Sequence, residues 1–205
     1  MKLDLHVHTK YSKDSKMEPS TVVSRALKLG LDGVAVIDHG TVKGGLAVRK
    51  IAPKSLTVIV GSEVKTDRGE VIGYFIEEEI PHGVFQEVVE EIRAHGGVAV
   101  VPHPYDPFRP NSLSPREEDA GVLDGLEVFN SRCLLDRTNK RAIKFARTHG
   151  LIMTAGSDAH TPGEIGASGV VVEAVEDIRK NGSIEIFGRR TPMAELFKAR
   201  VRGFL

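Results

Sequence analysis

Leu3-Asp4-Leu5-His6-Val7-His8 is a short apolar run that ends in two histidines. Five later stretches follow the same design, in which an apolar run ends in a histidine, a carboxylate or an asparagine: residues 34–39, 57–63, 98–103, 126–130 and 151–160. Short apolar runs bounded by glycine or proline are typical of buried parallel strands. Parallel strands end on one face, so we expect these polar groups to converge there, as they do in the active sites of α/β barrels.

Helical patterns lie between the predicted strands. The first begins with Pro19 as its first helical residue and ends at Gly30, where a capping glycine is favoured. Further helices are expected over residues 84–95 and roughly 134–149, and a last one from residue 191 to at least residue 201. This alternation of strands and helices predicts a parallel sheet or barrel.

Two segments break the alternation. Asp67-Arg68-Gly69 is a turn signal between two β-like runs, which predicts a hairpin over residues 64–76. Residues 105–115 are rich in proline and show no periodicity, so we expect an irregular loop beside the site.

Length and cysteine content limit the class of protein. The 205 residues suit one α/β domain, which we expect to span residues 1–205. No apolar run approaches the ~20 residues of a membrane span. Because the first strand pattern begins at Leu3, we expect no signal peptide, and the lone Cys133 cannot form an intramolecular disulfide. We therefore expect a cytoplasmic protein without a membrane partner.

The charges of the chain balance. Lys and Arg together number 28, as do Asp and Glu, so there is no overall basic footprint for nucleic acid. Trp is absent and aromatic residues make up 5%, which weakens any stacking platform. We therefore expect a small phosphorylated partner and no stable nucleic-acid complex, although a local basic patch stays possible.

Histidines and carboxylates recur at the predicted strand ends. His6 and His8 are two residues apart on a strand, so their side chains point to the same face. Asp158 and His160 repeat this geometry, and Glu63 ends another strand. A single His-x-His pair is most simply two histidines on a half-exposed strand. Ligand-type residues on this many strands instead indicate a metal site, and donors without a thiolate favour Zn, Mn or Fe(II).

An ordered set of motifs resembles those of the PHP (polymerase and histidinol phosphatase) phosphoesterases: LHVHTKYS (5–12), IDHG (37–40), GSEV (61–64), VPHP (101–104), EVFNSR (127–132) and AGSDAH (155–160). The stand-alone proteins similar to nucleoside 3′,5′-bisphosphate phosphatases are the nearest branch. The resemblance spans about residues 1–166. It implies a distorted (β/α)7 TIM-like barrel with two or three divalent ions (Zn, Mn or Fe) at its C-terminal mouth.

The resemblance also implies a set of ligands, shared among the ions. It assigns one metal to His6, His8, Glu63 and Asp158, a second to Asp14, His39 and His160, and a further one to His103 and the bridging Glu63.

Two positions depart from the family pattern. Glu70 stands where relatives often have a histidine, and it is either an oxygen ligand or an ordinary surface residue. Asn130 occupies a slot that is histidine in histidinol phosphatases, where it would ligate weakly, orient a water or hydrogen-bond the substrate. Close relatives also carry an inserted helical subdomain for which this chain has no room, so we expect a more open pocket.

The resulting hypothesis is a metal-dependent hydrolase that cleaves a phosphomonoester of a nucleotide or short oligonucleotide with a metal-activated hydroxide. Arg132 and Arg109 are the candidate cations for the phosphoryl group, unless each simply faces solvent. His39, His103 or a metal-bound water would protonate the leaving group. One alternative is a histidinol-phosphate phosphatase, against which Asn130 counts, and another is a non-catalytic metal-stabilised accessory module.

Several other residues are expected to have ordinary roles. His95 and His149 each precede a glycine at a predicted helix end, and His82 lies in a loop, so none should bind metal. Asp38 is expected to orient a ligand or cap its strand.

Overall fold

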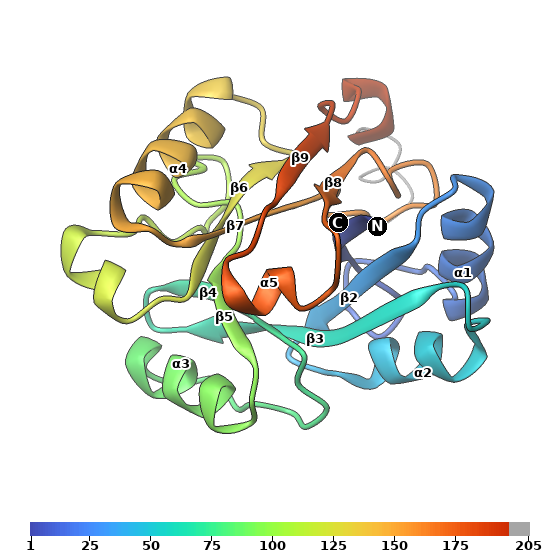
Figure 1. Cartoon of the computed structure of the whole chain (residues 1–205), viewed down its shortest axis with the longest axis horizontal. Helices are drawn as coiled ribbons and strands as arrows, with labels where there is room; N and C mark the ends of the chain where they lie inside the picture. The colour runs from blue at the N-terminus through green and yellow to red at the C-terminus, as the bar shows by residue number, and fades with distance from the viewer. Residues whose placement is uncertain (197–205) are drawn as a thin grey trace.

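The computed structural model describes residues 1–196 of the chain. All six predicted parallel strands are present: β1 (Lys2–Val7), β2 (Gly33–His39), β3 (Thr57–Thr66), β5 (Val98–Val101), β6 (Gly125–Asn130) and β7 (Ile152–Gly156). The sheet order is β7-β6-β5-β4-β3-β2-β1-β8-β9. An isolated parallel bridge between Val7 and Ala159 returns the β7 end to β1, so strands β1 to β7 form a nearly closed barrel (Figure 1). The predicted distorted (β/α)7 TIM-like barrel is confirmed.

The distortion of the barrel comes from the predicted hairpin. β4 (Gly69–Tyr74) pairs antiparallel with β3, with Thr66 opposite Gly69, and antiparallel with β5 on its other side. Two reversals leave β5 parallel to β3, so its carboxyl end still reaches the common face. A second hairpin, β8 (Ser168–Val171) with β9 (Glu185–Gly188), was not predicted from the sequence. Its strand β8 pairs antiparallel with β1, on the side of β1 away from β2.

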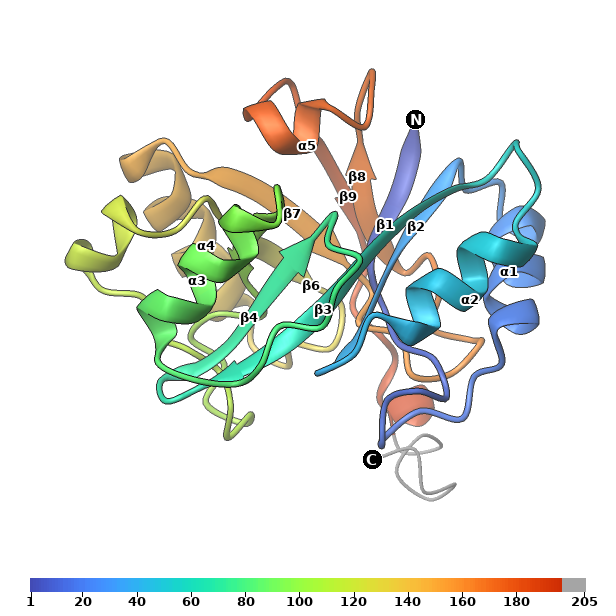
Figure 2. The same ribbon diagram turned by 90° about the horizontal axis from the view of Figure 1, so that it is seen from below.

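Helices cover the outside of the barrel (Figures 1 and 2). The predicted helices are α1 (Pro19–Lys28), α3 (Phe85–Ala94) and α4 (Asp136–His149), and the predicted irregular loop precedes the 3-10 helix η1 (Glu117–Gly121). α2 (Lys43–Ile51) and α5 (Asp177–Lys180) were not expected. Of the last predicted helix, residues 193–196 are helical, and the rest lies outside the described residues. The predicted extent of the domain, residues 1–205, includes that segment and stays a prediction.

Close packing explains the two glycines in the first turn of α2. A Cβ on Gly44 would lie 1.7 Å from Asp38 Oδ2 and 2.3 Å from Thr9 Oγ1, so only glycine lets the helix approach β2 and the loop after β1. Gly45 similarly faces the Val60 backbone. The pair therefore serves helix–strand packing.

The core has an inner layer inside the barrel and an outer layer between the strands and the covering helices. Alternate strand residues such as Leu5, Ile37 and Ile72 fill the barrel interior, where the Tyr74 hydroxyl donates a hydrogen bond to the Leu5 carbonyl 2.9 Å away. α5 closes the amino end of the barrel, with Ile178 in this cluster (Figure 1). The carboxyl ends of the parallel strands lie at the opposite end, the lower side of Figure 2. Among the described residues, no helix has the length and apolar character needed to cross a membrane.

Candidate metal centre

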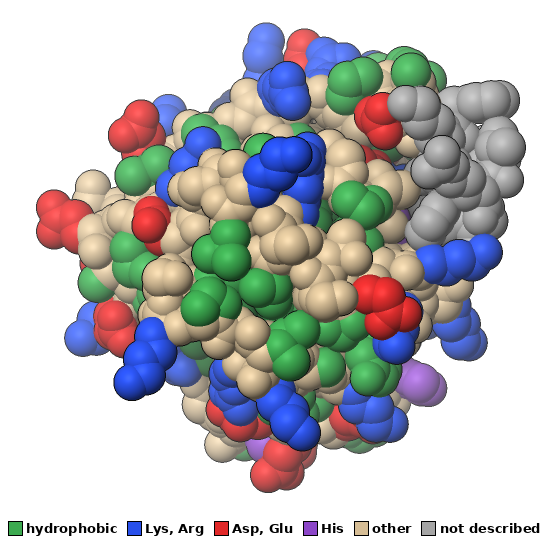
Figure 3. All heavy atoms as spheres, turned by 90° about the vertical axis from the view of Figure 1, so that its right-hand side faces the viewer, with side chains coloured by type: hydrophobic (Ala, Val, Ile, Leu, Met, Phe, Trp, Pro, Cys, Tyr) green, Lys and Arg blue, Asp and Glu red, His purple; other side chains and the backbone are tan. Residues whose placement is uncertain are grey.

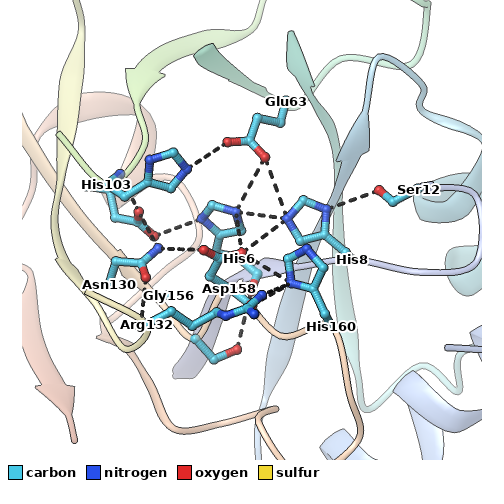
Figure 4. Close-up of polar contacts among 12 residues, drawn as sticks. His6, His8, Ser12, Glu63, His103, Asn130, Arg132, Gly156, Asp158 and His160 are labelled. Carbon is cyan, nitrogen blue, oxygen red and sulfur yellow. Dashed lines mark hydrogen bonds and ion pairs between the residues drawn. The ribbon is translucent and has the colours of Figure 1, made fainter. Parts of the chain in front are cut away.

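The strand ends bring the predicted site residues into one cluster (Figure 4). His6 on β1 and His8 directly after it project together, with their Nε2 atoms 3.1 Å apart. His8 Nε2 lies 3.6 Å from Glu63 Oε2 and 3.4 Å from Asp158 Oδ1, just beyond β7. The prediction that Glu63 ends its strand is wrong, because β3 continues to Thr66 through its pairing with β4. The side chains of all four residues are buried. Residues far apart in sequence therefore offer nitrogen and oxygen atoms to one small volume.

Buried hydrogen bonds orient His6 and His8. Glu127 on β6 lies 2.9 Å from His6 Nδ1, which directs the other ring nitrogen into the cluster. His8 Nδ1 lies 3.2 Å from the Ser12 hydroxyl, and that hydroxyl donates to Asp38 at 2.9 Å. Asp38 thus holds the loop after β1 and orients His8 through Ser12, as a carboxylate behind a metal-ligating histidine does.

A second group lies beside the first. Asp14 Oδ2 is 3.2 Å from His39 Nε2 and 3.1 Å from His160 Nε2. The His8 ring packs against both of these histidines, with centroid distances of 4.7 Å to His39 and 4.4 Å to His160. His8 therefore belongs to both groups.

Glu63 joins the remaining predicted ligands. Its Oε1 lies 3.1 Å from His103 Nε2, and its Oε2 lies 3.2 Å from His39 Nδ1. Glu70 on β4 comes within 3.7 Å of His39 Nδ1 and is buried, so it is not an ordinary surface residue. The hairpin turns this carboxylate towards the centre.

The predicted arginines occupy different positions. Arg109 reaches in from the 105–115 loop and pairs with Asp158 Oδ2 at 2.6 Å. Arg132 is buried, with its Nη1 2.5 Å from His160 Nδ1 and 3.4 Å from the Asp158 carbonyl oxygen, so it does not face solvent. The Asn130 amide donates to Glu127 at 2.9 Å and to Asp158 at 3.2 Å. Asn130 therefore links the carboxylates beneath the cluster.

The protonation states suit ligands of a cation. Burial lowers the pKa of His8 to about 4, and the nearby His160 acts in the same direction, so this imidazole is neutral at pH 7. Burial alone would raise the pKa of Asp158, but the Arg109 and His6 charges hold it well below its usual range. Although burial opposes it, Glu63 and Asp14 raise the pKa of His39 to about 10. The protons on such histidines compensate the carboxylates, and a bound metal would displace them.

The residues present fit divalent ions. Two buried ligand atoms, Asp14 Oδ1 and His103 Nδ1, have no hydrogen-bond partner. Within the described part of the chain, three groups hold ligand atoms within 4.8 Å of one another: His8, Asp14, His39 and His160; His6, His8 and Asp158; and His39, Glu63 and Glu70. Imidazole and carboxylate donors in threes and fours suit Zn, Mn or Fe. The third group contains Glu70 beside Glu63, whereas the resemblance implies His103 as the ligand that shares a metal with Glu63.

The cluster forms the floor of an open pocket of about 590 Å³. Arg109 and Arg132 stand on its walls, and its rim is apolar, with Phe108, Leu134 and Met193. Phe108 and Met193 are 62% and 66% exposed, the highest values among the large hydrophobic side chains that the structure describes. The pocket thus combines a polar floor with an apolar mouth.

The sequence reasoning missed several supporting carboxylates. Glu127 and Asp4 lie inside apolar strand runs, and both are fully buried. Asp4 accepts hydrogen bonds from the Ser157 hydroxyl and the Gly166 amide, which anchors the chain after β7 to β1. Glu164 accepts from the His160 amide at 3.0 Å. A charged residue within an apolar strand was the available signal for the first two.

Comparison with protein families gives two matches. The PHP domain matches residues 4–149, and the PHP-associated region PHP_C matches residues 136–183. Two uncharacterized proteins of Methanocaldococcus jannaschii are relatives. MJ1587 is 42% identical over 143 residues, 64% of this chain and 82% of the relative, and MJ0417 is 31% identical over 211 residues, 98% of this chain and 84% of the relative.

Solved structures share the fold at low sequence identity. A two-domain Bacteroides vulgatus protein with a predicted PHP-like metal-dependent phosphoesterase has a TM-score of 0.74 and 20% identity over 92% of this chain, which spans 65% of that protein. A candidate metal-dependent phosphoesterase of Bifidobacterium adolescentis has a TM-score of 0.72 and 21% identity, and the match covers 89% of this chain and 97% of that one. Endonuclease Q bound to a 27-mer duplex with an abasic lesion has a TM-score of 0.69 and 18% identity, and the match covers 92% of this chain and 59% of that one.

Proposed function

Because the chain belongs to the PHP domain family, we propose that it is a metal-dependent phosphoesterase acting on a phosphate ester of a nucleotide or short oligonucleotide. The convergence of His8, Glu63 and Asp158 carries this proposal, because His8 Nε2 lies 3.6 Å from a Glu63 oxygen and 3.4 Å from an Asp158 oxygen. Divalent ions held there would activate a water and neutralise charge on the phosphoryl group.

The arginines differ in their proposed tasks. Arg109 faces the pocket with 23% of its side chain exposed, so it would donate to phosphoryl oxygens beside Asp158. Arg132 is buried behind His160 and would hold that imidazole in place. Proton transfer to the leaving group would fall to whichever of His39 and His103 does not hold a metal ion; both line the pocket on the Glu63 side.

The apolar rim supports an organic leaving group. Exposed apolar side chains gathered at one pocket mark a ligand-binding surface. Phe108 and Met193 would contact the part of the substrate that lies beyond the phosphate, and a nucleobase has the flat apolar faces that such a rim accepts. The open pocket and the unpartnered Asp14 and His103 atoms favour an enzyme over an accessory module.

The test uses protein stripped of metal and then loaded with Mn²⁺ or Zn²⁺. We expect hydrolysis of p-nitrophenyl phosphate that EDTA abolishes and that Asp158→Asn reduces by at least about 100-fold, more than the loss of a supporting residue. Glu173→Gln, an exposed carboxylate far along the chain, is the matched control. Hydrolysis that survives chelation would overturn the proposal, and circular dichroism checks that the variants are folded.

A further inference from the structure

The outer face of α4 carries five cations that the proposed chemistry does not use. They are Arg137, Lys140, Arg141, Lys144 and Arg147, all exposed. At 3.6 residues per turn, their positions fall within about a third of the helix circumference. Asp136 is the only carboxylate of α4, so this helix is strongly basic in a chain whose net charge is zero.

No carboxylate among the described residues lies within ion-pair distance of the five cations, although Asp136 is near enough for the Lys140 charge to act on it. Within residues 1–196, none of them forms an ion pair, and Asp136 pairs with Arg190 instead. Arg141 packs flat on the Tyr105 ring, with its Cζ 3.9 Å from the ring centroid. On the side formed by α1 and α2, in contrast, Lys and Arg side chains alternate with acidic and hydrophobic ones (Figure 3).

A second hollow, of about 540 Å³, adjoins this face. Arg116, Arg141 and Lys144 stand around it, and Glu117, which also lines it, is paired with His149 at 3.0 Å. Arg116 is likewise paired, with Glu118 at 3.3 Å, so Arg141 and Lys144 supply the free positive charge at the hollow.

The basic face continues from the metal centre. α4 begins two residues after Leu134, which lines the main pocket. Asn139, on the inner side of α4, accepts a hydrogen bond from the backbone N–H of Asn130. The 105–115 loop separates the two hollows, because Arg109 faces the metal centre while Tyr105 lies against α4. A chain molecule that leaves the centre on this side meets α4 next.

We propose that the α4 face binds the phosphate backbone of a single-stranded oligonucleotide whose reacting phosphate lies at the metal centre; this rests on the proposed function. The cations recur about every turn of the helix, roughly 5.4 Å, and extend about 15 Å from Arg137 to Arg147. The exposed face has no large apolar residue, unlike a helix that lies on a membrane. A repeating anion is the partner that this charge pattern fits.

The test compares two triple variants with equal loss of charge. R137Q/K140Q/K144Q removes part of the α4 face, and K28Q/K50Q/K54Q removes three exposed lysines from α1, α2 and the loop after α2. Anisotropy of a labelled 12-mer DNA strand is followed over a salt series in EDTA, which prevents hydrolysis. Binding weakens with salt, and each phosphate contact contributes about −0.7 to the slope of log K against log salt. Loss of three contacts should therefore make the slope of the α4 variant less steep by about 2.

The control variant should bind like the unmodified chain. Equal binding by both variants, or binding without a salt-dependent slope, would overturn the proposal. Hydrolysis of p-nitrophenyl phosphate should be unchanged in both, while the KM for the 12-mer should rise only in the α4 variant. If no phosphoester is hydrolysed but strand binding still depends on α4, the binding face stands and the phosphoesterase function fails.

Discussion

Glu127 shows how one buried side chain organises the centre. Its two oxygens accept hydrogen bonds from the His103 amide at 2.7 Å and from Asn130 at 2.9 Å, and they lie 2.9 Å from His6 Nδ1. A carboxylate in this position fixes which nitrogen of His6 carries the proton and increases the basicity of the other. Glu127 thus controls a ligand without lining the pocket.

Glu127→Gln should weaken metal binding while preserving the fold. The amide keeps the shape but loses the charge that holds the His6 ring, so we expect a 10- to 100-fold loss of Mn²⁺ affinity. Competition with a chelating dye measures this affinity. Glu90→Gln, exposed on α3, should bind like the unmodified chain, and equal affinities for both variants would contradict the role assigned to Glu127.

Cys133 should be unreactive in the folded protein. It is 1% exposed, and burial raises the pKa of its thiol, so the reactive thiolate is rare even at alkaline pH. A thiol reagent at pH 8 should label no cysteine in the folded chain and one after unfolding in guanidinium. Rapid labelling without denaturant would show that the segment between β6 and α4 opens.

Residues at strand ends could be predicted from the sequence, and supporting residues within strands could not. His6, His8 and Asp158 stand where an apolar run stops, and the parallel strands bring such ends together. Glu127 and Asp4 interrupt runs that are otherwise apolar, and no pattern says which partner compensates a buried charge. Those partners are set by barrel closure, which joins residues over a hundred positions apart.

At the scale of elements, closure depends on the contact between β7 and β1. A Cβ on Gly156 would lie 2.2 Å from His6 Cβ and 2.6 Å from the His6 nitrogen. The two strands approach there without a side chain between them. The same contact places Asp158 beside His6 and His8.

Gly156→Ala should therefore disturb both stability and the centre. Overpacking costs about 1–3 kcal/mol, occasionally more, and we expect at least the upper value because the obstacle includes backbone. Chemical denaturation measures the free energy of unfolding. Gly121→Ala, whose Cβ would meet nothing within 4 Å, is the control and should change stability little. If Gly156→Ala left the free energy of unfolding unchanged, β7 could move away from β1.

Elements with strong periodicity were predictable, and short ones fixed by packing were not. α4 has a clear apolar face and a glycine after it, and the structure begins it two residues after the expected start. α2 has Gly44-Gly45 in its first turn, which weakens a helical pattern, yet the adjacent Asp38 and Val60 leave room only for glycine. Such tertiary demands override local propensity.

For the whole molecule, metal binding should depend on pH. A metal that binds His39 must displace its proton, and the pKa of His39 is about 10, so protons compete throughout the neutral range. Mn²⁺ affinity should rise with pH between 6 and 9, up to about tenfold per unit for each displaced proton. Calorimetric titration in buffers of different ionisation enthalpy counts the protons released. A constant affinity over this range would contradict the competition.

Metal should also stabilise the entire barrel, because its proposed ligands come from strands on all sides. A ligand that binds only the folded state at 100 times its Kd adds about 2.7 kcal/mol, which for this length corresponds to a Tm rise of about 5–11 °C. Mn²⁺ is the suitable probe, since zinc also binds unfolded Cys and His. Thermal melts with Mn²⁺ and with EDTA should show this rise in the unmodified chain and in Glu173→Gln, but not in Asp158→Asn. An equal rise in Asp158→Asn would place the metal elsewhere on the chain.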